Sequence, residues 1–256
     1  MKIAIIDADL IGRTKHRFPN LACMKISSYY KSLNNDVTLK TDYNNIEVFD
    51  KVFISKVFTD TPVPDDVLEL PNIEYGGTGF YYDKAPKLPD VIEHCKPDYH
   101  LYDAYVNRQV SLGFKREKYK DYLQYSIGFL TRGCIRHCSF CINKLESSIK
   151  VYSPLECFLD DERGDDGKLV RPYIYLWDDN FLASDPDVWR SLLKQLIATK
   201  RPFQFRQGLD ERMLAQSPYG EEMAQLLAKS KYHGDFIFAF DNWRDRELIE
   251  KALEKI

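Results

Sequence analysis

The most informative stretch of this chain is residues 131–141, Thr-Arg-Gly-Cys-Ile-Arg-His-Cys-Ser-Phe-Cys. It places Cys134, Cys138 and Cys141 at the spacing C-x3-C-x2-C, directly after an apolar run at residues 125–131 that is predicted to be a strand. Thiolates select zinc or iron–sulfur clusters, and three of them leave one iron of a four-iron cluster without a protein ligand. An open metal position is typical of a catalytic site. The spacing therefore favours a [4Fe–4S] cluster.

A zinc site is the main alternative interpretation of these cysteines, with His137 or Cys157 as the fourth ligand. Zinc sites usually show two separated pairs of ligands, and the sequence has no second C-x2-C or H-x3-H pair. Basic residues flank the cysteines and either offset the negative charge of a cluster or form a solvated rim. They are Arg132, Arg136 and Lys144. The remaining cysteines are interpreted as small apolar residues and are not assigned to the metal.

The composition excludes several classes of protein. The chain has 256 residues, 44% of them hydrophobic, and a formal net charge of −3. The overall charge therefore does not favour binding to nucleic acid or to an anionic membrane. The N-terminus does not resemble a signal peptide, and no apolar stretch is long enough to span a bilayer. We expect a cytoplasmic protein without a membrane partner. The basic, Tyr-rich residues 115–122 are compatible with RNA contact, but a solvated linker is the favoured interpretation.

The order of predicted elements indicates an α/β fold with two domains. Residues 1–100 are predicted to form a Rossmann-like domain with a mostly parallel sheet, residues 101–123 a linker, and residues 124–256 a second series of alternating strands and helices. The strands of the first domain are expected at residues 2–6, 36–40, 51–58 and 73–75, with a helix at 19–33. Those of the second are expected at residues 125–131, 172–177, 203–207 and 235–240, with helices starting near 153 and at 186–199, 221–229 and 245–256.

The cysteine spacing, the aromatic Phe140 before the last cysteine and the location after a strand resemble the signature of the radical SAM superfamily. The resemblance implies that Cys134, Cys138 and Cys141 bind a [4Fe–4S] cluster and that S-adenosylmethionine chelates its fourth iron. An electron from an external donor then cleaves S-adenosylmethionine to methionine and a 5′-deoxyadenosyl radical. Phe140 would lie against the adenine. The protein's part is to bind, orient and exclude water.

Further cofactor contacts are implied by the same resemblance. The Gly-Gly-Glu segment usual in the family is missing, and Asp178, Asp179 and Asn180 stand in its place, similar to a variant in relatives with a cobalamin-binding-like N-terminal domain. Acidic and amide groups there can accept hydrogen bonds from the methionyl ammonium, although a cluster of helix N-caps is the alternative. Polar residues at the ends of the third and fourth strands would contact the ribose or carboxylate. They are Arg206, Gln207 and Asp241.

The first domain looks like a cobalamin-binding-type Rossmann domain at residues 7–12, 16–21 and 76–80. The Asp-x-His-x-x-Gly motif for cobalamin binding through a histidine is missing, because the residue two positions after Asp7 is Asp9. The sequence therefore leaves cobalamin binding open and slightly favours its absence. The glycines at 76, 77 and 79 are suited either to a phosphate cradle or to a tight turn.

The expected fold is thus a Rossmann-like domain followed by what the resemblance implies is a partial radical SAM βα barrel. We expect this barrel to be truncated, because four strand-helix units are predicted where the family has six. Three functions are compatible with it. The first is a radical SAM enzyme, with methyl or methylthio transfer suggested by the N-terminal domain type. The others are an iron–sulfur electron carrier or sensor, and a zinc-stabilised module that binds RNA or protein. No residue identifies the substrate.

Overall fold

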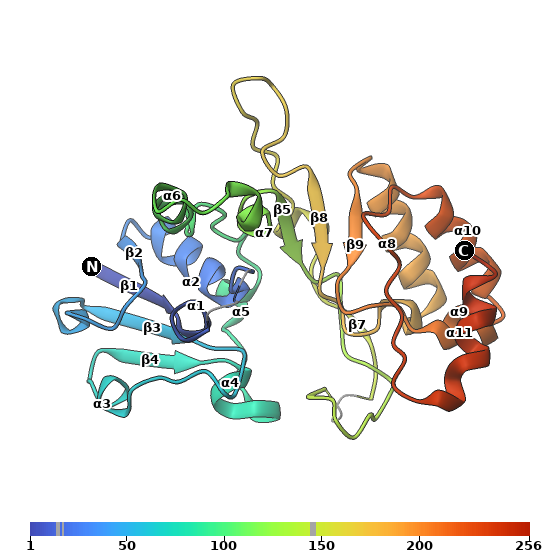
Figure 1. The fold of residues 1–256 in the computed structure, drawn as a ribbon, viewed down its shortest axis with the longest axis horizontal. Coiled ribbons are helices and arrows are strands. Elements are labelled where there is room, and N and C mark those ends of the chain that lie inside the picture. The colour runs from blue at the N-terminus through green and yellow to red at the C-terminus, as the bar shows by residue number, and fades with distance from the viewer. Residues whose placement is uncertain (14–15, 17, 144–146) are drawn as a thin grey trace. The chain divides into compact units, whose positions relative to one another are not determined.

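The structure is a computed structural model that describes residues 1–13, 16, 18–143 and 147–256. The chain divides into two compact units, Met1–Gln124 and Tyr125–Ile256 (Figure 1). Each unit contains its own parallel sheet with strands and helices in alternation. The predicted α/β class, with an N-terminal Rossmann-like sheet, is confirmed.

The first unit contains a four-stranded parallel sheet in the order β2-β1-β3-β4. Its strands are β1 (Lys2–Asp7), β2 (Asp36–Lys40), β3 (Lys51–Ser55) and β4 (Ile73–Gly76). Side chains alternate across a strand, so Ile3 and Ile5 enter the core that contains the helix α2 (Leu21–Ser32), while Ala4 and Ile6 enter the core on the opposite face. The carboxyl ends of β1 and β3 are neighbours, and the winding changes direction between them, which is where open α/β sheets bind ligands.

The segment expected to be a linker, residues 101–123, is part of the first unit. It forms α6 (Asp103–Ser111), a 3-10 helix η3 (Arg116–Tyr119) and α7 (Lys120–Leu123). Tyr102, Val106, Tyr119 and Tyr122 are buried in the same core as Ile3. The burial of these aromatic rings, rather than the charge of the segment, decides where it lies. The other short helices of this unit are α1 (Ala8–Gly12), η1 (Ile46–Val48), α3 (Asp65–Leu68), α4 (Thr78–Tyr81), η2 (Tyr82–Lys84) and α5 (Asp90–Glu93).

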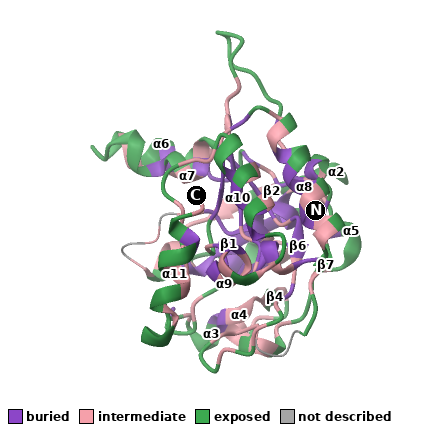
Figure 2. Cartoon of the chain, turned by 90° about the vertical axis from the view of Figure 1, so that its right-hand side faces the viewer, coloured by how far each residue is buried: buried purple, intermediate pink, exposed green. Residues whose placement is uncertain are grey.

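The second unit contains a three-stranded parallel sheet in the order β5-β8-β9. Its strands are β5 (Tyr125–Gly128), β8 (Tyr173–Leu176) and β9 (Phe203–Phe205). The helix α8 (Pro186–Ala198) packs Trp189 and Leu193 against Ile174 and Phe203 of this sheet, as its apolar stripe predicts. Nearly all residues of these three strands are buried. The helix α11 (Arg246–Leu253) has an exposed outer face (Figure 2).

The remaining elements of the second unit depart from the sequence prediction in several places. They are β6 (Thr131–Arg132), β7 (Lys150–Val151), η4 (Leu155–Cys157), η5 (Phe181–Ala183), α9 (Glu211–Gln216), α10 (Gly220–Lys229) and η6 (Trp243–Asp245). The helix expected near residue 153 is only the short η4. The strand expected at 235–240 is reduced to isolated bridges from Tyr232 to Phe203 and from Phe238 to Leu209. Its partner β9 ends in a turn at Arg206, so a continuous ladder cannot form.

Between η4 and β8 the chain forms a hairpin that extends beyond β5 and β8 (yellow in Figure 1). An antiparallel bridge joins Arg163 to Leu169, and the Gly164 N–H donates to the carbonyl of Lys168. Residues 161–168 are exposed.

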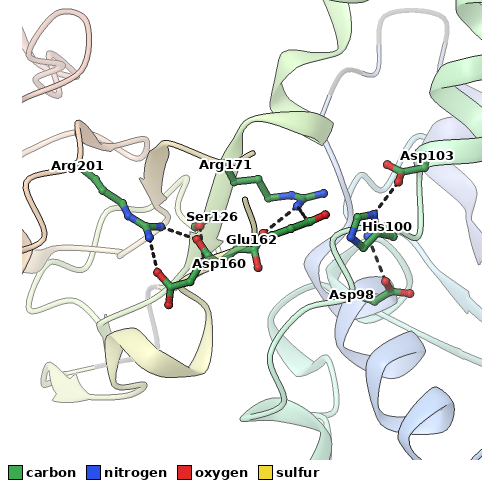
Figure 3. A network of polar contacts seen from close by, with 9 residues as sticks. Asp98, His100, Asp103, Ser126, Asp160, Glu162, Arg171 and Arg201 are labelled. Carbon is green, nitrogen blue, oxygen red and sulfur yellow. Dashed lines mark hydrogen bonds and ion pairs between the residues drawn. The ribbon is translucent and has the colours of Figure 1, made fainter. Parts of the chain in front are cut away.

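Two buried arginines hold the base of this hairpin (Figure 3). Arg171 Nη1 donates to Asp160 Oδ2 at 2.8 Å and to Glu162 Oε2 at 2.7 Å. Arg201 Nη1 donates to the carbonyl of Asp160 at 2.6 Å, and its Nη2 donates to the carboxylate of Asp161. Buried guanidinium groups paired in this way make the hairpin base a rigid part of the unit.

Within the described residues, no helix combines the length and the apolar character needed to cross a bilayer.

Candidate functional site

The cysteine loop, residues 133–143, begins at a glycine against which another part of the backbone packs closely. The short strand β6 pairs antiparallel with β7, and Gly133 follows it with a φ of +103°. A Cβ at Gly133 would lie 2.1 Å from the carbonyl oxygen of Ser148, so both the conformation and the space require glycine. This residue sets the direction in which the chain leaves β6 toward Cys134.

The three cysteine thiols of the loop are free and partly buried. The backbone N–H of Arg136 donates to Cys134 Sγ at 3.3 Å, and that of Asn143 donates to Cys141 Sγ at 3.4 Å. Hydrogen bonds to sulfur are one of the means by which proteins set the properties of iron–sulfur clusters. The loop therefore offers sulfur ligands that already have donors beside them.

Burial and neighbouring groups change the pKa of one thiol in the loop. The pKa of the Cys138 thiol is raised mainly by burial, and Cys141, Cys134 and Asp241 raise it further, while Arg212 opposes them. The other two thiols of the loop are thus within electrostatic range of Cys138. Metal ligation requires the thiolate form, so binding at this loop would release protons.

A site for a single metal ion, such as zinc, requires several ligands close together. Across the described residues, no three His, Cys, Asp or Glu side chains gather closely enough to hold one ion. A zinc site with His137 or Cys157 as fourth ligand would need such a gathering. In a four-iron cluster each cysteine binds a different iron, so the finding concerns a single ion and leaves the cluster a prediction.

Asp178 lies just past the carboxyl end of β8 and is 1% exposed. Its Oδ1 accepts hydrogen bonds from the Thr131 N–H at 2.6 Å and the Thr131 hydroxyl at 2.7 Å, and its Oδ2 accepts one from the Leu130 N–H at 3.2 Å. Burial raises the pKa of Asp178 to about 6, although these hydrogen bonds oppose the rise. Its carboxylate is thus engaged by the backbone that leads into the cysteine loop.

Asp179 binds both ends of the cysteine loop. Its Oδ2 accepts a hydrogen bond from the Gly133 N–H at 2.8 Å, and its Oδ1 accepts one from the side-chain amide of Asn143 at 2.6 Å. The Arg132 Nε lies 3.6 Å from Oδ2. One partly buried carboxylate therefore joins a residue before the first cysteine to a residue after the last.

Asn180 and Asp210 contact the middle of the loop. Asn180 Nδ2 lies 3.5 Å from Cys134 Sγ and donates to Asp210 Oδ2 at 2.9 Å. Asp210 Oδ2 also accepts from Arg136 Nε at 2.9 Å, and Oδ1 accepts from Arg212 Nε at 2.7 Å. Burial would raise the pKa of Asp210, but these hydrogen bonds outweigh it and hold the pKa below its ordinary value. The Oδ1 of Asn180 is buried and has no hydrogen-bond partner among the described residues.

Sequence reasoning missed Asp210. It is the N-cap of α9, accepting from the Arg212 N–H, and an aspartate before a helix is a readable signal. Because α9 itself was not predicted, its cap was not recognised either.

The other predicted contact residues are exposed. Phe140 is 66% exposed, and Arg206 and Gln207 occupy the turn after β9. The guanidinium of Arg206 lies 4.6 Å from the centre of the Tyr175 ring. Among the described residues, no hydrogen bond or ion pair joins Arg206 or Gln207 to the cysteine loop, whereas Asp241 lies within electrostatic range of Cys138. Lys144 lies outside the described residues.

The corresponding edge of the first unit is occupied by side chains that bond to one another. The Tyr102 hydroxyl donates to Asp7 Oδ2 at 2.8 Å and accepts from the Asn20 N–H at 2.9 Å. The Asn20 side-chain amide donates to Ser55 Oγ at 3.0 Å. The buried ring of His16 has its Nε2 3.6 Å from Asp7 Oδ2. These contacts join the carboxyl ends of β1 and β3 to the chain before α6.

The glycines after β4 allow two parts of the backbone to approach each other closely. Gly77 has a φ of +102°, and a Cβ there would lie 2.3 Å from the carbonyl oxygen of Lys56. The Gly79 N–H donates to the same carbonyl at 3.0 Å. The structure thus shows the tight turn that was one of the two interpretations of this stretch.

The first unit does not display a fit to histidine-bound cobalamin. Asp7 and Asn20 are engaged internally, and the side chain of His16 is 2% exposed. Arg17, part of the stretch that resembles cobalamin-binding domains, lies outside the described residues. The function proposed below therefore includes no step through cobalamin.

No family model matches the sequence, and no curated protein matches it. Solved structures do match. One is the cobalamin-dependent S-adenosylmethionine radical enzyme OxsB, determined with aqua-cobalamin and S-adenosylmethionine bound and also with aqua-cobalamin bound. The TM-score is 0.57 at 13% identity over 99% of this chain and 47% of OxsB. This chain thus spans about half the length of OxsB.

A second match is the radical S-adenosylmethionine methyltransferase TsrM from Kitasatospora setae, determined with cobalamin and a [4Fe–4S] cluster bound. The TM-score is 0.55 at 11% identity over 99% of this chain and 67% of TsrM. At such identities the likeness concerns the fold, and it extends over both units. Both units of this chain share their α/β fold with part of these two radical S-adenosylmethionine enzymes.

Proposed function

We propose that this chain binds a [4Fe–4S] cluster through Cys134, Cys138 and Cys141 and cleaves S-adenosylmethionine reductively. The observation that supports the proposal most is the loop itself. Three partly buried free thiols follow the short strand β6, with backbone N–H groups and the Asn180 amide placed as donors to two of the sulfurs. The fold shared with OxsB and TsrM supports the same function.

A bound cluster would pass one electron from an external donor to the sulfonium of S-adenosylmethionine, which breaks a C–S bond and yields methionine and a 5′-deoxyadenosyl radical. The chain's residues supply the thiolates, orient the methionyl group and exclude water. Asn180 is suited to accept a hydrogen bond from the methionyl ammonium, because its Oδ1 is buried without a partner in the described part of the chain.

Four exposed residues are proposed to contact the rest of the cofactor. Phe140 presents an aromatic face to the adenine, and Arg206, Gln207 and Asp241 supply polar groups for the ribose and the carboxylate. Arg206 is the best candidate for the carboxylate, since a guanidinium pairs with it through two hydrogen bonds.

Methyl or methylthio transfer is the reaction class that we propose, by analogy with the fold shared with TsrM. The substrate is left open, because no residue of the described site selects one.

Anaerobic reconstitution with iron and sulfide tests the proposal. We expect four irons and four sulfides per chain, as a [4Fe–4S] cluster requires, an electron paramagnetic resonance signal on reduction, and 5′-deoxyadenosine when S-adenosylmethionine and dithionite are added. A cluster without 5′-deoxyadenosine would indicate an electron carrier or sensor instead. Stoichiometric zinc that iron does not replace would indicate a zinc-stabilised binding module and would contradict the proposal.

A further inference from the structure

We propose that Asp179 is a positioning residue that closes the cysteine loop, and that Asp178 and Asp210 hold the same loop at its entry and its middle. The inference rests on the function proposed above for this loop. It gives Asp178 and Asp179 a role different from the cofactor contact that their sequence position implies.

Asp179 carries the strongest part of the argument. Its two oxygens accept from opposite ends of the loop, the Gly133 N–H at 2.8 Å and the Asn143 side-chain amide at 2.6 Å. The three cysteines all lie between these residues. The side chain of Asp179 is only 12% exposed, so water competes poorly for these hydrogen bonds, and they hold the loop ends together.

Asp178 holds the entry to the loop. A carboxylate offers about four acceptor positions, and three donors already occupy this one. The remaining acceptor position is buried with the rest of the carboxylate, which is 1% exposed, so an incoming ammonium group would reach it only by displacing the Thr131 or Leu130 donors. Displacing them would leave buried N–H groups without acceptors, which disfavours Asp178 as a direct contact for a ligand.

Asp210 holds the middle of the loop through Arg136, which lies between Cys134 and Cys138 in the sequence. The same Oδ2 receives the Asn180 amide, which also reaches Cys134 Sγ. Asp210 is fixed in turn as the N-cap of α9. Asp210 therefore attaches the loop to the start of a helix through Arg136 and Asn180.

The three carboxylates stand on strand ends and a helix start, which are more rigid supports than the loop. Groups that hold metal ligands from such elements keep the ligands in place before the metal arrives, and their removal typically costs about 10- to 100-fold in metal affinity. We therefore expect the loop to be ordered by the protein rather than by the cluster.

The first experiment uses the cluster-free protein and hydrogen–deuterium exchange of peptides that cover the cysteine loop. Asp179→Ala should accelerate exchange at the Gly133 amide about tenfold, because a hydrogen bond to a charged group is lost. Asn143→Ala removes the other partner and should accelerate exchange in the loop by a smaller factor. Exchange in the double variant should be only slightly faster than in Asp179→Ala, since both changes break the same bridge between the loop ends. Asp187→Asn, an exposed carboxylate of α8, is the matched control and should change nothing.

The second experiment uses the reconstituted protein and a chelator. Asp179→Ala should lose iron about tenfold faster than the wild type and show an altered resonance signal, whereas its remaining loaded fraction should bind S-adenosylmethionine with unchanged affinity. Unchanged circular dichroism would show that the variant folds, and Asn143→Ala supplies the same test if it does not.

Two results would overturn the inference. One is unchanged exchange in both variants. The other is unchanged iron retention together with weaker binding of S-adenosylmethionine, which would make Asp179 a cofactor contact. If the wild type takes up no cluster, the proposed function fails, but the exchange experiment still decides whether Asp179 closes the loop.

Discussion

The two parallel sheets of this chain use polar residues at their carboxyl ends in different ways. In the first unit, Asp7 accepts a hydrogen bond from Tyr102, and the hydrogen bonds of this tyrosine in the described part of the chain join segments of that unit to one another. In the second unit, Asp178 and Asp179 bind a loop that carries three free thiols. A polar group at the end of a strand therefore does not by itself indicate a functional site. What their hydrogen bonds hold in place distinguishes a structural edge from a functional one.

The largest effect should come from the thiols themselves. Replacing Cys134, Cys138 and Cys141 together by alanine should abolish iron binding and 5′-deoxyadenosine formation, because no sulfur ligand remains in the cysteine loop. Cys95→Ala, a partly buried thiol of the first unit, should leave both unchanged. Iron analysis after reconstitution checks the comparison. Retained iron in the triple variant would show that the wrong edge has been identified as functional.

The next effect is structural and confined to the second unit. Arg171→Met should destabilise it by about 3–5 kcal/mol, because Asp160 would keep a buried charge without its guanidinium partner. All three tryptophans lie in this unit, so urea unfolding followed by tryptophan fluorescence reports on it. Lys168→Ala, which removes an exposed ion pair of the hairpin, should give no measurable change. Equal effects of the two variants would contradict the assignment of Arg171 to the buried base.

A smaller effect should appear in the pH dependence of stability. The folded-state pKa of Asp178 is raised from 3.8 to about 6, so the folded state holds more protons than the unfolded state between these values. Its contribution is therefore fully favourable below about pH 4 and is lost as the pH rises through 6, by about 3 kcal/mol at most. Asp178→Asn should remove this component. Parallel curves for the variant and the wild type between pH 4 and 6.5, measured by urea unfolding, would refute it.

The smallest effect is expected at the edge of the first unit. Tyr102→Phe removes the hydroxyl that links Asp7 to the Asn20 N–H, and it should cost about 1–2 kcal/mol. Hydrogen exchange should accelerate at the start of α2, while the cysteine loop and its iron content should not change. A loss of iron in this variant would show that the two edges are not independent.

The sequence predicted the scaffold better than the site. Strong periodicity located β1, β3 and α8, and the cysteine spacing identified the loop. It could not show what Asp178 and Asp179 bind, since Thr131 and Gly133 are more than 40 positions away and only the fold brings them close. It also missed Asp210, because the short helix that it caps has too few apolar residues for a periodic signal. The charged residues in 101–123 suggested a solvated linker, whereas buried tyrosines pack this segment into the core of the first unit.

The arginine-held hairpin between η4 and β8 has a practical use. Its tip, around Asp165 and Asp166, is exposed and turns through Gly167 at a φ of +74°, while the buried guanidinium groups anchor the base. Exposed tips on firm bases tolerate inserted peptides. An affinity tag or a fluorescent label placed between these aspartates would therefore provide a handle for immobilising or tracking the protein while leaving its thiols unmodified.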